Sequence, residues 1–128
     1  MISFMLDKYN KDIENNIYNI AKAFAIRIVK LYKYLTDEKH EYIISKQVFR
    51  SGTSIGANVF EAKNAQSRPD FTSKMNIALK EATETCYWID LLHDTHYISD
   101  SEFDSISDDC SKITAVLTKI VKATKDKS

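Results

Sequence analysis

Two cysteines and three histidines are the side chains of this chain best suited to nucleophilic or metal chemistry. His93 and His96 follow Asp90 on one stretch, three and six residues later. A di-iron helical bundle needs an inward Glu from each of two helices and a Glu-x-x-His pair from each of two more. The chain offers one Asp90–His93 pair, without a second copy, and no Glu falls on an inward-facing row of the predicted helices. The sequence therefore predicts no metal site and no cofactor.

The cysteines, Cys86 and Cys110, are expected to be buried thiols in a reducing compartment. A nucleophilic Cys needs a neighbour that favours its thiolate, and neither has a histidine at a helical neighbour position. Helical register instead places both in or near the apolar seam. A glycine-rich phosphate loop is also missing, because both glycines lie inside a predicted helix. The sequence thus predicts no catalytic residue, and we expect the protein not to be an enzyme.

The composition favours an all-α protein. A chain of 128 residues with 44% hydrophobic content can bury one respectable core, and two Gly with one Pro are too few for a β-sandwich or barrel. The formal net charge is zero, so no strong overall field attracts nucleic acid or a membrane. No apolar run reaches the ~18 residues of a spanning helix, and the N-terminus lacks a signal-peptide pattern. We expect a cytoplasmic protein with no membrane partner.

Apolar residues recur at helical spacing in four segments. The first covers residues 19–35, after an N-terminal arm or short helix over residues 1–17, and the second runs from about residue 41 to residue 66. Ser67 with Asp70 three residues later is a start signal for the third helix. Ser99 with Glu102 is the corresponding signal for the fourth.

The third and fourth helices each carry one regular apolar row. The third row is Phe71, Met75, Ala78, Ala82, Thr85, Ile89 and Leu92. The fourth is Phe103, Ile106, Cys110, Ile113, Leu117, Ile120 and Thr124. Four helices with short links predict an up-down-up-down four-helix bundle over residues 18–128.

Gly52 and Gly56 are the only glycines and lie one turn apart inside the second helix. Each costs about 1 kcal/mol relative to Ala in a helix interior, so their presence needs a packing reason. They fall on one face, which gives the helix a flattened side for close approach of another backbone. The small residues Ala78 and Ala82 of the third helix suit that approach. Gly52, Gly56, Ala78 and Ala82 are therefore predicted to be the close-packing site.

Polar residues of the second and third helices pair if the two helices are antiparallel about Arg68. That arrangement places Arg50 near Glu84 or Cys86, Ser51 near Thr85, and Glu61 near Lys74 or Met75. In one interpretation the ion pairs set the register, and Asn58 is a hydrogen-bonded polar core residue. In the other, the exposed polar groups form a recognition patch, which comprises Arg50, Asn58, Glu61, Lys80, Glu81 and Glu84.

The outer surfaces of the first two helices suggest two kinds of contact. Lys22, Lys30 and Lys33 project to one side of the first helix, within about 80° of each other. They form either a solvated face or a contact for RNA. Both helices also carry more apolar surface than a four-helix core absorbs, which predicts self-association. The surplus residues are Ile26, Val29, Phe49 and Phe60.

Three blocks of the chain resemble one bacterial family. They are FAIRIVKLY (residues 24–32), SKQVFRSGTSIGANVFEA (residues 45–62) and IALKEATETCYWIDLL (residues 77–92), with Asp70, Phe71 and Lys74 between the last two. Over roughly residues 22–98 the chain is similar to the 23S ribosomal RNA intervening-sequence proteins. The resemblance implies a left-handed four-helix bundle that assembles into a ring, typically a pentamer, with no known enzymatic activity.

A related group, the accessory proteins of diversity-generating retroelements, resembles the same bundle and engages nucleic acid with a strongly basic surface. This chain differs from that group because it is neutral overall. Two hypotheses follow. The protein is an oligomeric interaction module that binds an unidentified protein partner, or it is an accessory factor that binds RNA.

Overall fold

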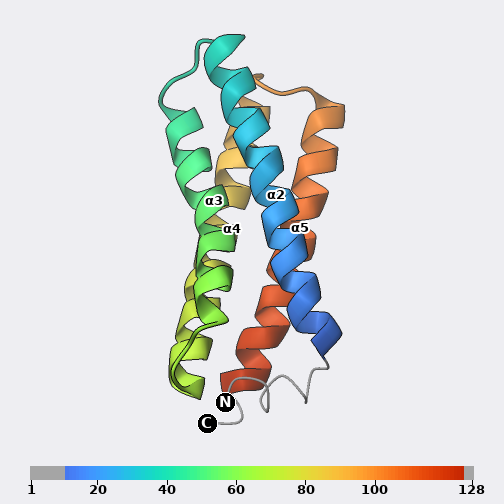
Figure 1. The fold of residues 1–128 in the computed structure, drawn as a ribbon. Helices are drawn as coiled ribbons and strands as arrows, with labels where there is room; N and C mark the ends of the chain where they lie inside the picture. The colour runs from blue at the N-terminus through green and yellow to red at the C-terminus, as the bar shows by residue number, and fades with distance from the viewer. Residues whose placement is uncertain (1–10, 126–128) are drawn as a thin grey trace.

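The computed structural model describes residues 11–125, which form four α-helices and contain no strand. In chain order they are α2 (Lys11–Asp37), α3 (Ile44–Ala62), α4 (Arg68–Asp94) and α5 (Asp100–Lys125). Figure 1 shows the four helices side by side along one axis, with each link turning the chain back at an end of the bundle. The prediction of an all-α helical bundle is confirmed. Within residues 11–125, no helix is long and apolar enough to cross a membrane.

The core is formed by one face of each helix, and α4 illustrates how directly the sequence specifies it. The buried residues of α4 are the predicted row of Phe71, Met75, Ala78, Ala82, Thr85, Ile89 and Leu92. Steps of three and four residues return to the same side of a helix, so one face of α4 is buried. The predicted row of α5 is also buried, except for Phe103 in the first turn, which is half-buried.

The first helix begins earlier than its sharpest periodicity suggested. α2 starts at Lys11, so residues 11–17 continue the helix that was expected from residue 19. Ile17 is fully buried and lies four residues before Ala21, which lies three before Phe24. The inward row therefore extends by at least one turn toward the N-terminus. Residues 1–10 of the predicted arm lie outside the described residues.

The two predicted start signals both operate as caps. The Asp70 N–H donates to Ser67 Oγ at 3.1 Å, but the Asp70 carboxylate accepts from the N–H of Gln66 rather than from that of Ser67. At the start of α5 the capping box is complete. Glu102 N–H donates to Ser99 Oγ at 3.2 Å, and Ser99 N–H donates to the Glu102 carboxylate at 2.8 Å. These caps satisfy backbone donors that the helices leave free.

The second helix is shorter than predicted, because its start is made by a side chain outside it. α3 begins at Ile44 rather than at Glu41 and ends at Ala62 rather than at residue 66. The buried Glu41 carboxylate accepts hydrogen bonds from the N–H groups of Ile43, Ile44 and Ser45 at 3.1, 2.9 and 2.6 Å. Burial by itself would raise the pKa of Glu41, but these backbone hydrogen bonds outweigh it and lower the pKa.

The glycine face packs against the first helix, not the third, so the predicted close-packing partner was wrong. A Cβ on Gly52 would lie 2.7 Å from Ile28 Cγ1, and one on Gly56 would lie 3.6 Å from the Ala21 carbonyl oxygen. Ile28 and Ala21 belong to α2. Ala78 and Ala82 are fully buried, and the Ala82 carbonyl accepts from the Cys110 thiol of α5 at 3.4 Å. The small residues therefore serve two different helix contacts.

Candidate functional site

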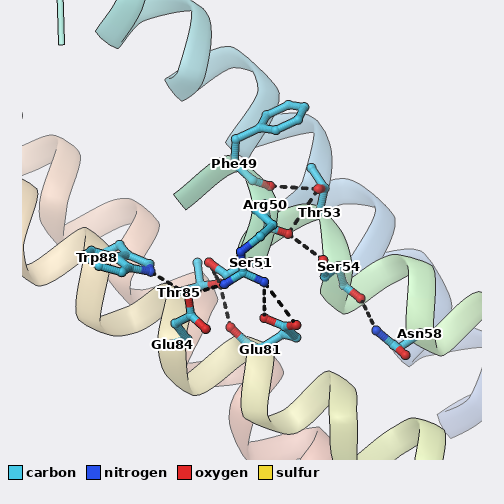
Figure 2. A network of polar contacts seen from close by, with 10 residues as sticks. All are labelled: Phe49, Arg50, Ser51, Thr53, Ser54, Asn58, Glu81, Glu84, Thr85 and Trp88. Atoms are coloured by element: carbon cyan, nitrogen blue, oxygen red, sulfur yellow. Dashed lines mark hydrogen bonds and ion pairs between the residues drawn. The ribbon is translucent and has the colours of Figure 1, made fainter. Parts of the chain in front are cut away.

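Arg50 of α3 is the centre of a polar network that joins α3 to α4 (Figure 2). Its guanidinium pairs with Glu84 and, at 3.3 Å, with Glu81. Glu84 also accepts from Trp88 Nε1 at 2.8 Å. The Trp88 hydrogen bond is the main influence on the pKa of Glu84, and together with Arg50 it lowers that pKa despite partial burial. The carboxylate of Glu84 is thus held in its charged form by two partners.

A second layer of the α3–α4 contact lies beneath this network, in the core. The hydroxyl groups of Ser51 and Thr85 share a hydrogen bond of 2.8 Å, and both residues are fully buried. Toward the other end of the two helices, Lys74 Nζ lies 3.0 Å from the Glu61 carboxylate. The antiparallel arrangement predicted these pairs, and the contacts of Arg50 with Glu84, Ser51 with Thr85 and Glu61 with Lys74 confirm that register.

Asn58 does not have the predicted role of a polar core residue between helices. Its side-chain amide donates to the carbonyl of Ser54, in the same helix, at 2.9 Å. The inward position at this level belongs to Val59, which is buried. Of the six residues of the predicted recognition patch, the structure brings three together, namely Arg50, Glu81 and Glu84. Glu61 pairs separately with Lys74, and Lys80 is exposed on α4.

Three of the four surplus apolar residues predicted on α2 and α3 are exposed. Ile26 of α2 is 50% exposed, and Phe60 and Phe49 of α3 are 53% and 37% exposed. Val29, predicted with them, is half-buried. Phe49 and Phe60 contact Tyr32 and Tyr18 of α2, and these four aromatic residues define the α2–α3 face.

Two aromatic pairs cross the α2–α3 face. The ring centroids of Tyr32 and Phe49 lie 4.8 Å apart, and those of Tyr18 and Phe60 lie 5.8 Å apart. Sequence reasoning did not find the two tyrosines. A signal was available, because residues 18 and 32 are about as far before the α2–α3 link as residues 60 and 49 are after it.

A shallow pocket of about 150 Å³ opens on the α2–α3 face. Tyr18, Phe60 and Lys22 line it together with four small residues, namely Ala25, Thr53, Gly56 and Ala57. The ammonium group of Lys63 lies 4.0 Å from the centroid of the Tyr18 ring, which places one positive charge at the edge of this face. A pocket with aromatic walls and a floor of small residues can accept an apolar side chain from another molecule.

Lys22, Lys30 and Lys33 are all exposed, and none has an ion-pair partner among residues 17–125. Arg27, on the same helix, differs from them because it lies 2.5 Å from Asp109 of α5 and 3.0 Å from Ser105 Oγ. The basic charge of α2 is therefore partly neutralised by Asp109 of α5. The three lysines keep their charge available on the outer side of the helix.

The Asp90–His93 region is a helix junction rather than a free, solvated helix end. His93 Nε2 lies 2.7 Å from the Asp100 carboxylate, and its ring stacks on Phe103 with centroids 4.1 Å apart. His93 therefore links α4 to α5, with its side chain 27% exposed. His96 lies two residues beyond the end of α4 with φ of 67°, and Asp90 is exposed. In the part of the chain that the structure describes, no three His, Cys, Asp or Glu side chains are grouped as metal ligands would be.

Comparison with known proteins places these surfaces in context. A model of the family described as 23S rRNA-intervening sequence protein matches residues 13–119. A crystal structure of a protein with unknown function, from the S23 ribosomal protein family of Bacteroides thetaiotaomicron, is 51% identical in sequence. That similarity covers 86% of this chain and 98% of the other, with a TM-score of 0.84. No curated protein matches the chain.

Proposed function

Because the chain belongs to the family of 23S rRNA-intervening sequence proteins, we propose that it is a non-enzymatic interaction module that works as a homo-oligomer. The observation that carries this proposal is the exposed α2–α3 face with its pocket. Contiguous apolar surface that a chain does not cover itself usually marks an interface with another molecule. The assembly we expect is a pentameric ring of left-handed up-down-up-down bundles in the cytoplasm, with its outer surface left for a protein partner.

The proposal of a non-enzymatic role is supported by how the polar groups are used. Arg50 is engaged by Glu81 and Glu84, and Glu84 by Trp88 as well. Glu41 is engaged by three backbone N–H groups. These side chains fix the register between helices and the start of α3, which are structural roles. An active site would instead place acids, bases or nucleophiles together in a cleft with perturbed pKa values.

Light scattering behind a sizing column tests the oligomer. We expect the purified chain to elute as a multimer at micromolar concentration. Phe60→Glu should shift it toward the monomer by placing a charge beside the pocket of the α2–α3 face, where Phe60 is 53% exposed. Ile77→Glu is the matched control, because Ile77 is 39% exposed on α4, away from the α2–α3 face. A wild-type monomer, or equal dissociation of both variants, contradicts the proposal. Circular dichroism confirms that each variant remains helical.

Binding of RNA is the second candidate function, and the three unpaired lysines of α2 favour it. In a ring, the three lysines would repeat with every subunit, so their weak attraction for RNA would become multivalent. Binding to single-stranded RNA would then weaken steeply between low and moderate salt, because each phosphate contact releases counterions.

Gel shifts with the purified oligomer at about 50 mM salt test this second function. We expect Lys22→Glu combined with Lys33→Glu to abolish retention of RNA. Lys46→Glu combined with Lys80→Glu is the control, since it changes the net charge equally on exposed sites of α3 and α4. If the wild type retains no RNA, the accessory-factor hypothesis fails and the protein-partner hypothesis stands alone.

A further inference from the structure

The contact between α4 and α5 brings the two cysteines to one level of the bundle. The Cys110 thiol donates to the Ala82 carbonyl at 3.4 Å, and the Cys86 sulfur lies 3.9 Å from Thr114 Oγ1. Ala82 precedes Cys86 by one turn on α4, and Thr114 follows Cys110 by one turn on α5.

These two contacts fix the position of the cysteines relative to each other. α4 and α5 run in opposite directions on either side of their short link (Figure 1). The contacts of Ala82 with Cys110 and of Cys86 with Thr114 are therefore the two diagonals of one four-residue rectangle. Cys86 and Cys110 form one side of that rectangle, so they lie at one level of the bundle on adjacent helices.

The two thiols differ in access to solvent and in acidity. Cys110 is fully buried, whereas Cys86 is half-buried. The neighbouring Cys110 thiol and, to a smaller extent, the Thr114 hydroxyl lower the pKa of Cys86 to about 7, against the effect of burial. The neighbouring Cys86 and burial raise the pKa of Cys110. Of the two thiols, Cys86 is therefore the one that ionises more readily.

We propose that Cys86 and Cys110 form a dithiol that responds to peroxide, in which Cys86 is the reactive sulfur and Cys110 converts it to a disulfide between α4 and α5. The Cys86 thiolate attacks one oxygen of hydrogen peroxide, the O–O bond breaks, and Cys86 sulfenic acid and, after protonation, water form. The Cys110 sulfur then attacks the Cys86 sulfur. The S–S bond forms, the S–O bond breaks, and the departing hydroxyl leaves as water with the Cys110 proton. Two thiols lose two electrons, and one peroxide becomes two waters.

Other chemistry for this pair has less support. Neither sulfur has a histidine among its contacts, and no third metal ligand stands beside them within residues 17–125. A disulfide, by contrast, requires an oxidant and two thiols on adjacent helices whose Cβ atoms can approach to about 4 Å. It would join two helices that follow each other in the chain, so the bundle could close it without changing its topology.

Oxidation of the purified full chain with hydrogen peroxide tests the proposal. Intact mass spectrometry should show the loss of two hydrogens, and a thiol assay should show both free thiols disappearing together. In Cys110→Ala, Cys86 should accumulate as sulfenic acid that a dimedone probe captures. In Cys86→Ser, loss of the Cys110 thiol should slow by at least ~10-fold, because the buried sulfur lacks its reactive partner.

Contrary results are equally specific. Wild-type protein that gains oxygen or forms only disulfides between chains, without losing two hydrogens, overturns the proposal. Equal reactivity of the Cys110 thiol in wild type and in Cys86→Ser overturns the assignment of roles. Circular dichroism of each variant before oxidation shows whether it is folded, and if Cys110→Ala is not, Cys110→Ser replaces it in the dimedone experiment.

Discussion

The two sides of α3 are held to their neighbours by different kinds of contact. Toward α4, α3 presents Arg50 to two glutamates and, deeper, Ser51 to the Thr85 hydroxyl. Toward α2 it presents small residues flanked by aromatic side chains, with Gly52 against Ile28 and Phe49 against Tyr32. The first contact satisfies its polar groups within the chain. The second leaves half of Phe60 uncovered.

This difference bears on both stability and function. Polar pairs between α3 and α4 specify alignment, but each exposed pair contributes little to the free energy of unfolding. The close fit between α3 and α2 depends on shape, so small changes of volume there are costly. The α3–α4 side has few groups left for a partner, whereas the α2–α3 side keeps apolar area that only another molecule can bury.

Gly52→Ala should have the largest effect, because it tests the close fit directly. The new Cβ would lie 2.7 and 2.9 Å from Cγ1 and Cγ2 of Ile28, a β-branched side chain that cannot easily move aside. We expect a loss of about 2 kcal/mol in the free energy of unfolding, measured by urea titration. Gly56→Ala is the control, since its Cβ meets only ordinary contacts, and it should stabilise by up to ~1 kcal/mol. Equal effects of the two variants would contradict the close fit at Gly52.

Thr85→Val should have the next largest effect, because it removes one partner of the buried hydroxyl pair. The Ser51 hydroxyl would then be left in the core without its bond to α4. We expect a loss of about 1–2 kcal/mol in the free energy of unfolding. Thr83→Val is the matched control on the same helix, because Thr83 is exposed and bonds only to its own helix at Leu79. A similar small loss in both variants would show that the hydroxyl pair does not hold α3 to α4.

Glu41→Gln should cost about 1 kcal/mol at neutral pH, because it removes the charge that caps α3. The folded-state pKa of Glu41 is lowered, so its contribution is fully present above the unfolded pKa of about 4.3. That contribution is lost as the pH falls through the folded pKa. Between pH 7 and pH 3, the melting temperature should therefore fall less for Glu41→Gln than for wild type. Glu38→Gln, on the exposed link nearby, should follow the wild type.

Arg50→Met should have the smallest effect, about 0.5 kcal/mol, because Arg50 is 49% exposed and water screens its ion pairs. The difference from wild type should shrink further as salt is added. Thermal melts at low and high salt measure both quantities, with Lys80→Met as the exposed control. If Arg50→Met lost more free energy of unfolding than Thr85→Val, the exposed ion pairs would hold α3 to α4 more strongly than the buried hydroxyl pair.

Much of the bundle could be predicted because its signals are local. The buried row of α4 from Phe71 to Leu92 repeats at three and four residues, and a helix turns such a row onto one face. The Ser99–Glu102 capping box joins groups three residues apart. The α3–α4 pairs follow from counting outward from a short link, so Arg50 with Glu84 needed only the antiparallel arrangement.

The sequence by itself determined which segments form helices and which face of each is apolar, since both depend on neighbours within a few residues. Each side of α3 could meet either α2 or α4, and only the tertiary structure decided which. Gly52 and Gly56 could have faced α2 or α4, and they face α2. Asn58 and Val59 are adjacent, and the rotation of α3 places Val59 inward. These outcomes depend on how all four helices fill one core at close-packed density, which the spacing within one helix does not specify.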